Sequence, residues 1–333
     1  MASFVVAVFA VVAVVAVVAV VAVVFGLVGV AGTPPSWPIV GDDRSPLRTI
    51  GSAQFGSGRC EAVACDIMQA FVFLATAVAA LVSVVTLWLV SVRIKDASIV
   101  DIFWGLGFVL LAWVARFVAD GDATRPNVVV VCTTVWGVRL GGYLFWRNHG
   151  KGEDYRYRAM RKKFGDRFAI MSLRTVYLTQ GVLMWIVSMP LQLGQMKSVP
   201  AGLGVVGVIG IALWAIGMLF ESVGDWQLAR FKANPASAGQ VMDRGLWSWT
   251  RHPNYFGDVC VWWGLFLISV RPGGFVIAAI VGPLAMTFLL VKVSGVPMLE
   301  KTIGRRRPGY GEYIARTSPF FPLPPKRSSE RVR

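Results

Sequence analysis

The stretch 243–267, DRGLWSWTRHPNYFGDVCVWWGLFL, sets a cluster of polar residues directly before a fully apolar, aromatic segment. The polar side chains of this cluster are Arg251, His252, Asn254, Tyr255 and Asp258. Polar groups pressed against such a run cost free energy unless they have partners. Pro253 and Gly257 disfavour regular helix, so we expect the backbone to turn here, at the boundary of a membrane.

Two interpretations of this cluster are open. Polar side chains beside an apolar segment predict a site for a charged ligand that also contacts an apolar molecule. Alternatively, the stretch is the N-terminus of an interfacial helix, with Asn254 or Asp258 as its cap and Arg251 reaching the lipid headgroups.

The composition of the whole chain is that of a polytopic membrane protein. Its 333 residues are 56% apolar and 15% charged, which is too apolar for a soluble domain. The net charge of +15 comes from basic residues in short loops between apolar runs, and this indicates contact with anionic lipid rather than nucleic acid. Four cysteines without a C-x-x-C pair and two histidines argue against a zinc site, so no metal is expected.

The N-terminal region differs from the rest of the chain. Residues 1–31 are a low-complexity Val/Ala segment that is long enough to span a bilayer. This segment is either an extra transmembrane anchor or an extension ahead of the true start, for which Met68 is an alternative. Residues 32–66 are rich in Gly, Pro, Ser and Asp and are predicted to form a flexible linker. A membrane domain over 67–325 and a basic tail over 326–333 complete the expected organisation.

Seven apolar segments predict an all-α fold, a seven-helix transmembrane bundle, because each is near the ~20 residues needed to cross a bilayer. They lie at 69–92, 99–119, 127–146, 176–194, 201–222, 256–271 and 274–294. Basic loops alternate with poorly charged ones: residues 147–174 hold nine basic and three acidic residues, and so do residues 295–333. The positive-inside rule therefore places 93–98, 147–174, 223–255 and the C-terminus in the cytoplasm.

Further polar candidates lie on the same predicted side. Arg139, with Tyr143, falls in or near the end of the third segment, where an arginine is either functional or reaching from a helix end to the headgroups. Asp225, followed by Lys232, marks either a site or a solvated helix extension. Asp101 lies within an apolar helix, so it is an interfacial cap, paired, or protonated and able to transfer a proton.

The motifs GLWSWTRHPNYFGDVCVWWG, the upstream DWQLARFK and the downstream RRPGYGEYIARTSPFFP resemble the steroid 5α-reductase superfamily of membrane enzymes. The resemblance covers about 67–325 and is closer to a bacterial branch of proteins similar to the reductase C-terminal domain. It implies a seven-helix bundle that holds NADPH in a cytoplasm-facing cavity. Such enzymes reduce a carbon–carbon double bond conjugated to a carbonyl in a lipid-like substrate.

The resemblance also implies residue roles. The implied cofactor contacts are Arg139, Asp225, Lys232, Arg251, His252, Asn254, Tyr255 and Asp258. Guanidinium and ammonium groups suit the phosphates, while carboxylates and Asn suit ribose hydroxyls and the carboxamide. The reductases polarise the substrate carbonyl with a Glu–Tyr pair, but here Trp136 aligns with the tyrosine and Asp101 only loosely with the glutamate. Tyr143 is the expected substitute, so the catalytic candidates are Tyr143 and Asp101.

The predicted function is therefore that of an NADPH-dependent oxidoreductase acting on CH–CH groups of a lipid, in a bacterial inner membrane with its site facing the cytoplasm. The substrate and membrane lipids are the expected partners. One alternative is an S-adenosylmethionine-dependent methyltransferase of the isoprenylcysteine type. Such enzymes share the RHPxY element but carry two adjacent glutamates where this chain has Glu300–Lys301. The other alternative is a non-enzymatic, lipid-binding membrane protein.

Overall fold

The computed structural model describes residues 54–119, 124–195, 202–270, 276–293, 295–296, 300 and 307–326. The Val/Ala segment, most of the predicted linker and nearly all of the predicted basic tail lie outside these residues. Helices dominate the described chain, and its single β-bridge joins Thr250 to Ser318. The predicted all-α fold is therefore confirmed.

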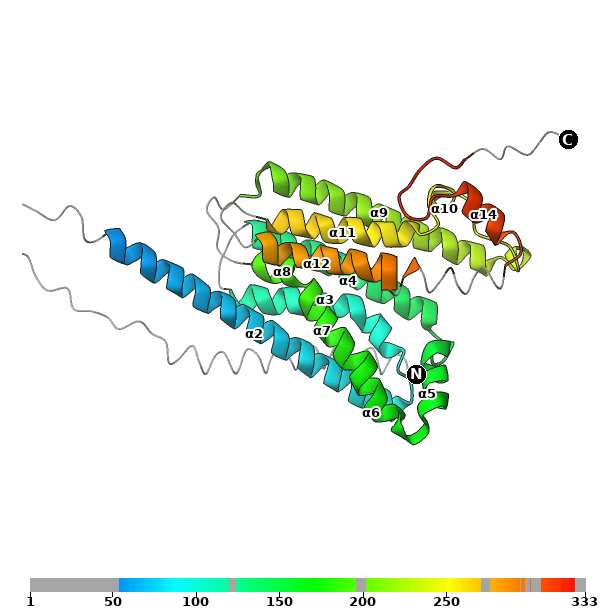
Figure 1. The fold of residues 1–333 in the computed structure, drawn as a ribbon, viewed down its shortest axis with the longest axis horizontal. Helices are drawn as coiled ribbons and strands as arrows, with labels where there is room; N and C mark the ends of the chain where they lie inside the picture. The colour runs from blue at the N-terminus through cyan, green and yellow to red at the C-terminus, as the bar shows by residue number, and fades with distance from the viewer. Residues whose placement is uncertain are drawn as a thin grey trace, which may run out of the picture. The chain divides into compact units, whose positions relative to one another are not determined.

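The helices follow one another along the chain with few long breaks (Figure 1). The first group is α2 (Gln54–Ile94), α3 (Ile99–Val118), α4 (Thr124–Asn148), α5 (Tyr155–Phe164), η1 (Gly165–Arg167), α6 (Phe168–Ser172), η2 (Leu173–Leu178), α7 (Thr179–Val187) and α8 (Met189–Leu193). The second group is α9 (Gly204–Ala233), η3 (Pro235–Ser237), α10 (Leu246–Trp249), α11 (Pro253–Ser269), α12 (Val276–Phe288), η4 (Leu289–Val293) and α14 (Tyr310–Arg316).

Five described helical segments are long and apolar enough to cross a membrane, so this is an integral membrane protein. They are Asp66–Ile94, Ile99–Val118, Thr124–Asn148, Tyr155–Val187 and Gly204–Ala233. The predicted number of seven is not confirmed. The reason is length, because α11 has 17 residues and the apolar helix after it, Ala278–Val293, is also short.

Two predicted boundaries are wrong. Helix α2 begins at Gln54, so the last part of the predicted linker is helical and continues directly into the first span. The predicted fourth span, 176–194, is instead a helical run over Tyr155–Val187 that ends before Pro190. Proline lacks an N–H and disfavours helix in the residue before it, which explains the break between α7 and α8.

The described chain forms two compact units, one made of residues 54–119 and 139–185 and the other of residues 124–138 and 186–326. In the first unit, α2 packs on α3 and on η2. Trp88 Nε1 donates a hydrogen bond to the carbonyl oxygen of Ala169 at 2.9 Å, and Trp185 Nε1 donates to that of Phe73 at 3.1 Å. Indole donors thus join helices distant in sequence.

In the second unit, α9 and α11 run side by side and antiparallel (Figure 1). Glycines recur every seven residues along the contact, at 210, 217 and 224 on α9 and at 257 and 264 on α11. A Cβ at Gly217 would lie 2.5 Å from the carbonyl oxygen of Gly257, and one at Gly264 would lie 2.6 Å from the amide nitrogen of Trp214. The two backbones therefore touch, as small residues allow in membrane helix pairs.

Candidate functional site

The close α9–α11 contact brings together two residues that the sequence predicted as cofactor contacts. Asn254 Nδ2 donates a hydrogen bond to Asp225 Oδ1 at 3.2 Å. Asp225 is buried, with an exposed fraction of 5%. Gly224 makes this approach possible, since a Cβ there would already lie 3.2 Å from Pro253 Cγ. Asp258, four residues after Asn254 on α11, follows on the same helix face and is half-buried.

One turn before Asp225 lies a buried carboxylate that the sequence analysis missed. Glu221 is 3% exposed, and its Oε2 accepts a hydrogen bond from Trp136 Nε1 at 3.0 Å. The Trp136 ring meets Trp262 edge to face, with centroids 5.4 Å apart, and both rings are fully buried. Trp136 therefore fills the position where the resemblance implies a tyrosine, and its N–H is directed at Glu221.

The Arg-His pair of the motif meets Glu300. Arg251 Nε donates to Glu300 Oε1 at 2.8 Å, and His252 Nε2 lies 3.1 Å from the same oxygen. The Arg251 side chain is 9% exposed, and its guanidinium also donates to the carbonyl oxygens of Ile314 and Thr317. This arrangement corrects the alternative in which Arg251 reaches the lipid headgroups, because its charge faces the interior of the C-terminal region.

The same segment binds the end of the described chain. Arg251 N donates to Ser318 O at 2.9 Å, and Thr250 Oγ1 donates to Phe320 O at 2.7 Å. Tyr313 Oη donates to Trp247 O at 2.6 Å. Burial raises the pKa of the Tyr313 hydroxyl above its ordinary value, so the phenol keeps its proton and remains a donor.

Helix α11 starts differently from the prediction. Its N-cap residue is His252, without a side-chain cap bond, so neither Asn254 nor Asp258 is the cap. Gly257 lies inside the helix rather than at a break. Its lack of a side chain allows the close contact between α11 and α9. The His252 ring stacks on Tyr255 at 5.6 Å with an angle of 11°. Burial lowers the pKa of His252 below its ordinary value, and Glu300 opposes part of that shift.

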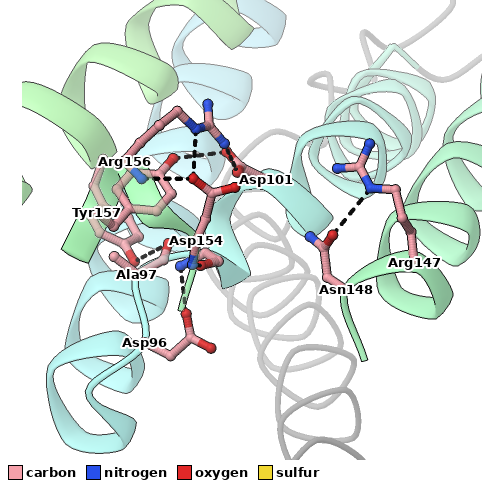
Figure 2. Close-up of polar contacts among 10 residues, drawn as sticks. Asp96, Ala97, Asp101, Arg147, Asn148, Asp154, Arg156 and Tyr157 are labelled. Atoms are coloured by element: carbon pink, nitrogen blue, oxygen red, sulfur yellow. Dashed lines mark hydrogen bonds and ion pairs between the residues drawn. The ribbon is translucent and has the colours of Figure 1, made fainter. Parts of the chain in front are cut away.

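In the first unit, Asp101 is paired (Figure 2). Its Oδ2 accepts from Arg156 Nη2 at 2.6 Å and its Oδ1 from Tyr157 Oη at 2.8 Å. Both donors belong to α5, which the sequence analysis treated as part of a cytoplasmic loop. Of the three expectations for Asp101, pairing is the one observed, and its predicted role as a proton donor remains a prediction.

A second set of contacts in this unit joins α5 to the α2–α3 turn. Arg161 donates two hydrogen bonds to Glu153, at 2.7 and 3.1 Å, and Glu153 Oε1 accepts from the Ala97 amide at 2.9 Å. Burial alone would raise the pKa of Asp154, but hydrogen bonds and charge from Arg156 hold it below its ordinary value. Asp154 is thus ionised near neutral pH and caps α5 by accepting from the Arg156 amide.

Tyr143 and Arg139, on α4, also lie in the first unit. The Arg139 guanidinium lies 5.5 Å from the centre of the Tyr143 ring, and that of Arg147 lies 5.8 Å from it. Cations at this distance from an aromatic ring are attracted to its face. These two α4 residues thus lie next to each other, while their roles toward cofactor and substrate remain predictions.

The residues of the second unit suit parts of a dinucleotide. Asp225 and Asn254 offer a carboxylate and an amide, groups that bind hydroxyls and a carboxamide. Lys232 is exposed in the last turn of α9, on the same helix face as Asp225 and roughly 10.5 Å further along it. Arg251 fits phosphate less well, because its guanidinium is already bound to Glu300 and to two carbonyls. Among the described residues, no group of three or more His, Cys, Asp or Glu side chains could hold a metal ion.

The arrangement defines a helical integral membrane protein with a buried polar site between two closely packed helices. Residues 87–317 match the model of a family described as "Protein of unknown function (DUF1295)". This is a family of steroid 5-alpha-reductase-like proteins, and the chain belongs to it. The predicted relation to the steroid reductases is thus confirmed at the level of the family.

The chain is also similar to "Uncharacterized protein C594.04c" of the fission yeast Schizosaccharomyces pombe, with 23% identity over 210 residues. The match covers 55% of this chain and 60% of the yeast protein. No solved structure matches the chain.

Proposed function

We propose that this protein is an NADPH-dependent reductase of a lipid-like substrate that carries a carbon–carbon double bond conjugated to a carbonyl. The observation that carries the proposal is the pairing of Asp225 with Asn254 across a helix contact in a chain of the steroid 5-alpha-reductase-like family. Both positions are the ones at which the resemblance implies cofactor contacts. The basic loops support a site that faces the cytoplasm.

The residues divide into holding and reacting groups. Asp225, Asn254 and Asp258 would hold the polar groups of the nucleotide, and Lys232 would bind a phosphate at the end of α9. Bound NADPH would supply a hydride. Glu221 would keep Trp136 in place through the bond to the indole N–H, so that the two buried tryptophans form an apolar wall.

A proton must also reach the substrate oxygen as charge develops there. Tyr143 is the better of the two predicted donors, because Asp101 already accepts hydrogen bonds from Arg156 and Tyr157. The guanidinium groups of Arg139 and Arg147 lie over the Tyr143 ring and would favour negative charge on its oxygen during the transfer.

A methyltransferase that uses S-adenosylmethionine is the second candidate. It is favoured by one observation, the contact of Arg251 and His252 with Glu300. In the methyltransferases two adjacent glutamates follow the last helix, and Glu300 stands at that place here. A lipid-binding protein without enzymatic activity is the third candidate, for which no contact in the described residues is specific.

The test uses purified full-length protein, a total lipid extract and NADPH that carries deuterium at the transferable position. We expect mass spectrometry to find deuterium on carbon in a lipid product. Asp225→Asn and Asn254→Ala should each raise the NADPH concentration needed by about tenfold, because hydrogen bonds to charged groups contribute about 1.5–3 kcal/mol. Glu312→Gln, a change of an exposed carboxylate on α14, is the matched control and should change nothing. Unchanged cofactor use by both site variants would place the site elsewhere.

A further inference from the structure

Helix α5 presents a row of cations on its outer face. Arg158, Lys162 and Lys163 are all exposed, and none of them forms a salt bridge with a described residue. Arg158 and Lys162 are four residues apart and so lie one above the other on the same face of the helix.

The inner face of α5 is fixed by the carboxylates nearby. Tyr157 and Arg156 bind Asp101, and Arg161 binds Glu153 through two hydrogen bonds (Figure 2 shows the Asp101 contacts). These carboxylates are therefore already paired with the inner-face donors. The outer-face cations form no ion pair with these carboxylates, and the inner-face contacts fix the orientation of α5.

Helix α5 is the charged start of the helical run Tyr155–Val187, whose 33 residues exceed the ~20 needed to cross a bilayer, so α5 lies outside the apolar part of that run, at the membrane surface. The span in α4 ends at Asn148, and α5 begins at Tyr155, only a short loop later. Trp146 and Tyr155, on either side of this loop, are 64% and 53% exposed. Exposed Trp and Tyr side chains gather at the level of the lipid headgroups. The outer-face cations thus lie where the phosphates of phospholipids are found.

We propose that the outer face of α5, formed by Arg158, Lys162 and Lys163, is a binding surface for the headgroups of anionic phospholipids. Basic side chains near a membrane surface bind such lipids mainly by charge, and each contributes roughly fivefold to affinity. Three cations held on one rigid helix act together, since the inner-face ion pairs order them before the lipid arrives. This surface is independent of the proposed reductase activity.

The test measures lipid binding to delipidated, full-length protein in neutral detergent. Short-chain phosphatidylglycerol, short-chain phosphatidylcholine and inorganic phosphate are titrated separately, and bound lipid is counted by native mass spectrometry. The variant R158Q/K162Q/K163Q is compared with R93Q/R244Q/K326Q, which removes the same charge from exposed positions outside α5. We expect the α5 variant to bind phosphatidylglycerol at least tenfold more weakly and the control variant less than twofold more weakly.

Three results would overturn the proposal. They are equal losses in the two variants, binding of phosphatidylcholine as tight as that of phosphatidylglycerol, and displacement of the lipid by equimolar phosphate. If the glutamine variant does not fold, wild-type protein still decides. Binding of phosphatidylglycerol must weaken as salt rises from about 50 mM to about 500 mM, because exposed charges are screened. Salt-insensitive binding would exclude the surface, and the charge-conserving R158K/K162R/K163R should bind like wild type.

Discussion

Asp101 in the first unit and Glu300 in the second each pair with an arginine that is distant in sequence. The two pairs differ in which member is more exposed to solvent. Asp101 is 19% exposed and binds Arg156, which is 41% exposed. Glu300 is 24% exposed and binds Arg251, which is 9% exposed. In the first pair the less exposed side chain is the carboxylate, and in the second pair it is the cation.

This difference determines what happens when a partner is removed. A charge left alone in a buried position costs several kcal/mol, whereas an exposed one returns to water. Loss of Glu300 leaves a buried guanidinium, while loss of the Asp101 charge leaves an exposed arginine that keeps Asp154 as a second partner. The carboxylate of the second unit should therefore matter more to stability.

The largest effect is expected for Glu300→Ala. We expect a loss of about 3 kcal/mol in the free energy of unfolding, because Arg251 would keep only its two carbonyl acceptors. Chemical unfolding in detergent measures this loss, with the exposed Glu312→Ala as control. Equal stability of the two variants would refute the argument from burial.

Gly257→Ala tests a contact that depends only on the close approach of the α9 and α11 backbones, without an ion pair. Its Cβ would lie 2.6 Å from the amide nitrogen of Glu221 and the carbonyl oxygen of Gly217, so we expect a loss of about 2 kcal/mol. Gly142→Ala is the matched control, since nothing lies within 4 Å of a Cβ there, and it should be neutral or slightly stabilising. The melting temperatures of the two variants test this difference.

A smaller effect is expected for Asp101→Asn. The amide keeps an acceptor for Tyr157, and Arg156 stays bound to Asp154, so we expect a loss of about 1 kcal/mol. Chemical unfolding under the conditions used for the Glu300 variant gives the value. A loss larger than that of Glu300→Ala would reverse the comparison between the two units.

The smallest effect concerns pH. Burial lowers the pKa of His252 in the folded protein below the ordinary value of about 6.5, so the unfolded chain binds its proton first. This contribution to stability is present above pH 6.5 and is lost as the pH falls toward the folded value. The melting temperature should thus decline below pH 6.5 in wild type and decline less in His252→Gln. Parallel pH curves would contradict the assignment.

The sequence predicted what depends on local pattern. Apolar runs predicted the helices. Asp225 and Asn254 were recognised as site candidates by residue type and motif, and the fold brings the two within hydrogen-bond distance. Helix α5 was missed because its short apolar stripe of Tyr157, Met160 and Phe164 lies among many charges, and its position depends on ion pairs with distant residues. Its preceding Asp154, an N-cap residue, was a signal that could have indicated it.

Contacts between distant residues could not be predicted in the same way. Glu221 lies within an apolar helix, where its carboxylate was a signal by itself, but its partner Trp136 is 85 residues away. Glu300 was named as a residue that follows the last apolar segment and in the methyltransferase alternative, but nothing local joins it to Arg251, 49 residues earlier. The seven-residue repeat of glycines on α9 and α11 was readable in the sequence and indicates close helix contact.

The proposed cofactor site lies between α9 and α11, where Asp225 and Asn254 would hold NADPH. The most direct measurement is a thermal-shift titration of the full-length protein with NADPH, NADH and S-adenosylmethionine side by side, since a ligand that binds only the folded state raises the melting temperature. We expect a rise with NADPH that is lost in Asp225→Asn and kept in Glu312→Gln. A rise with S-adenosylmethionine alone, or with none of the three ligands, would contradict it.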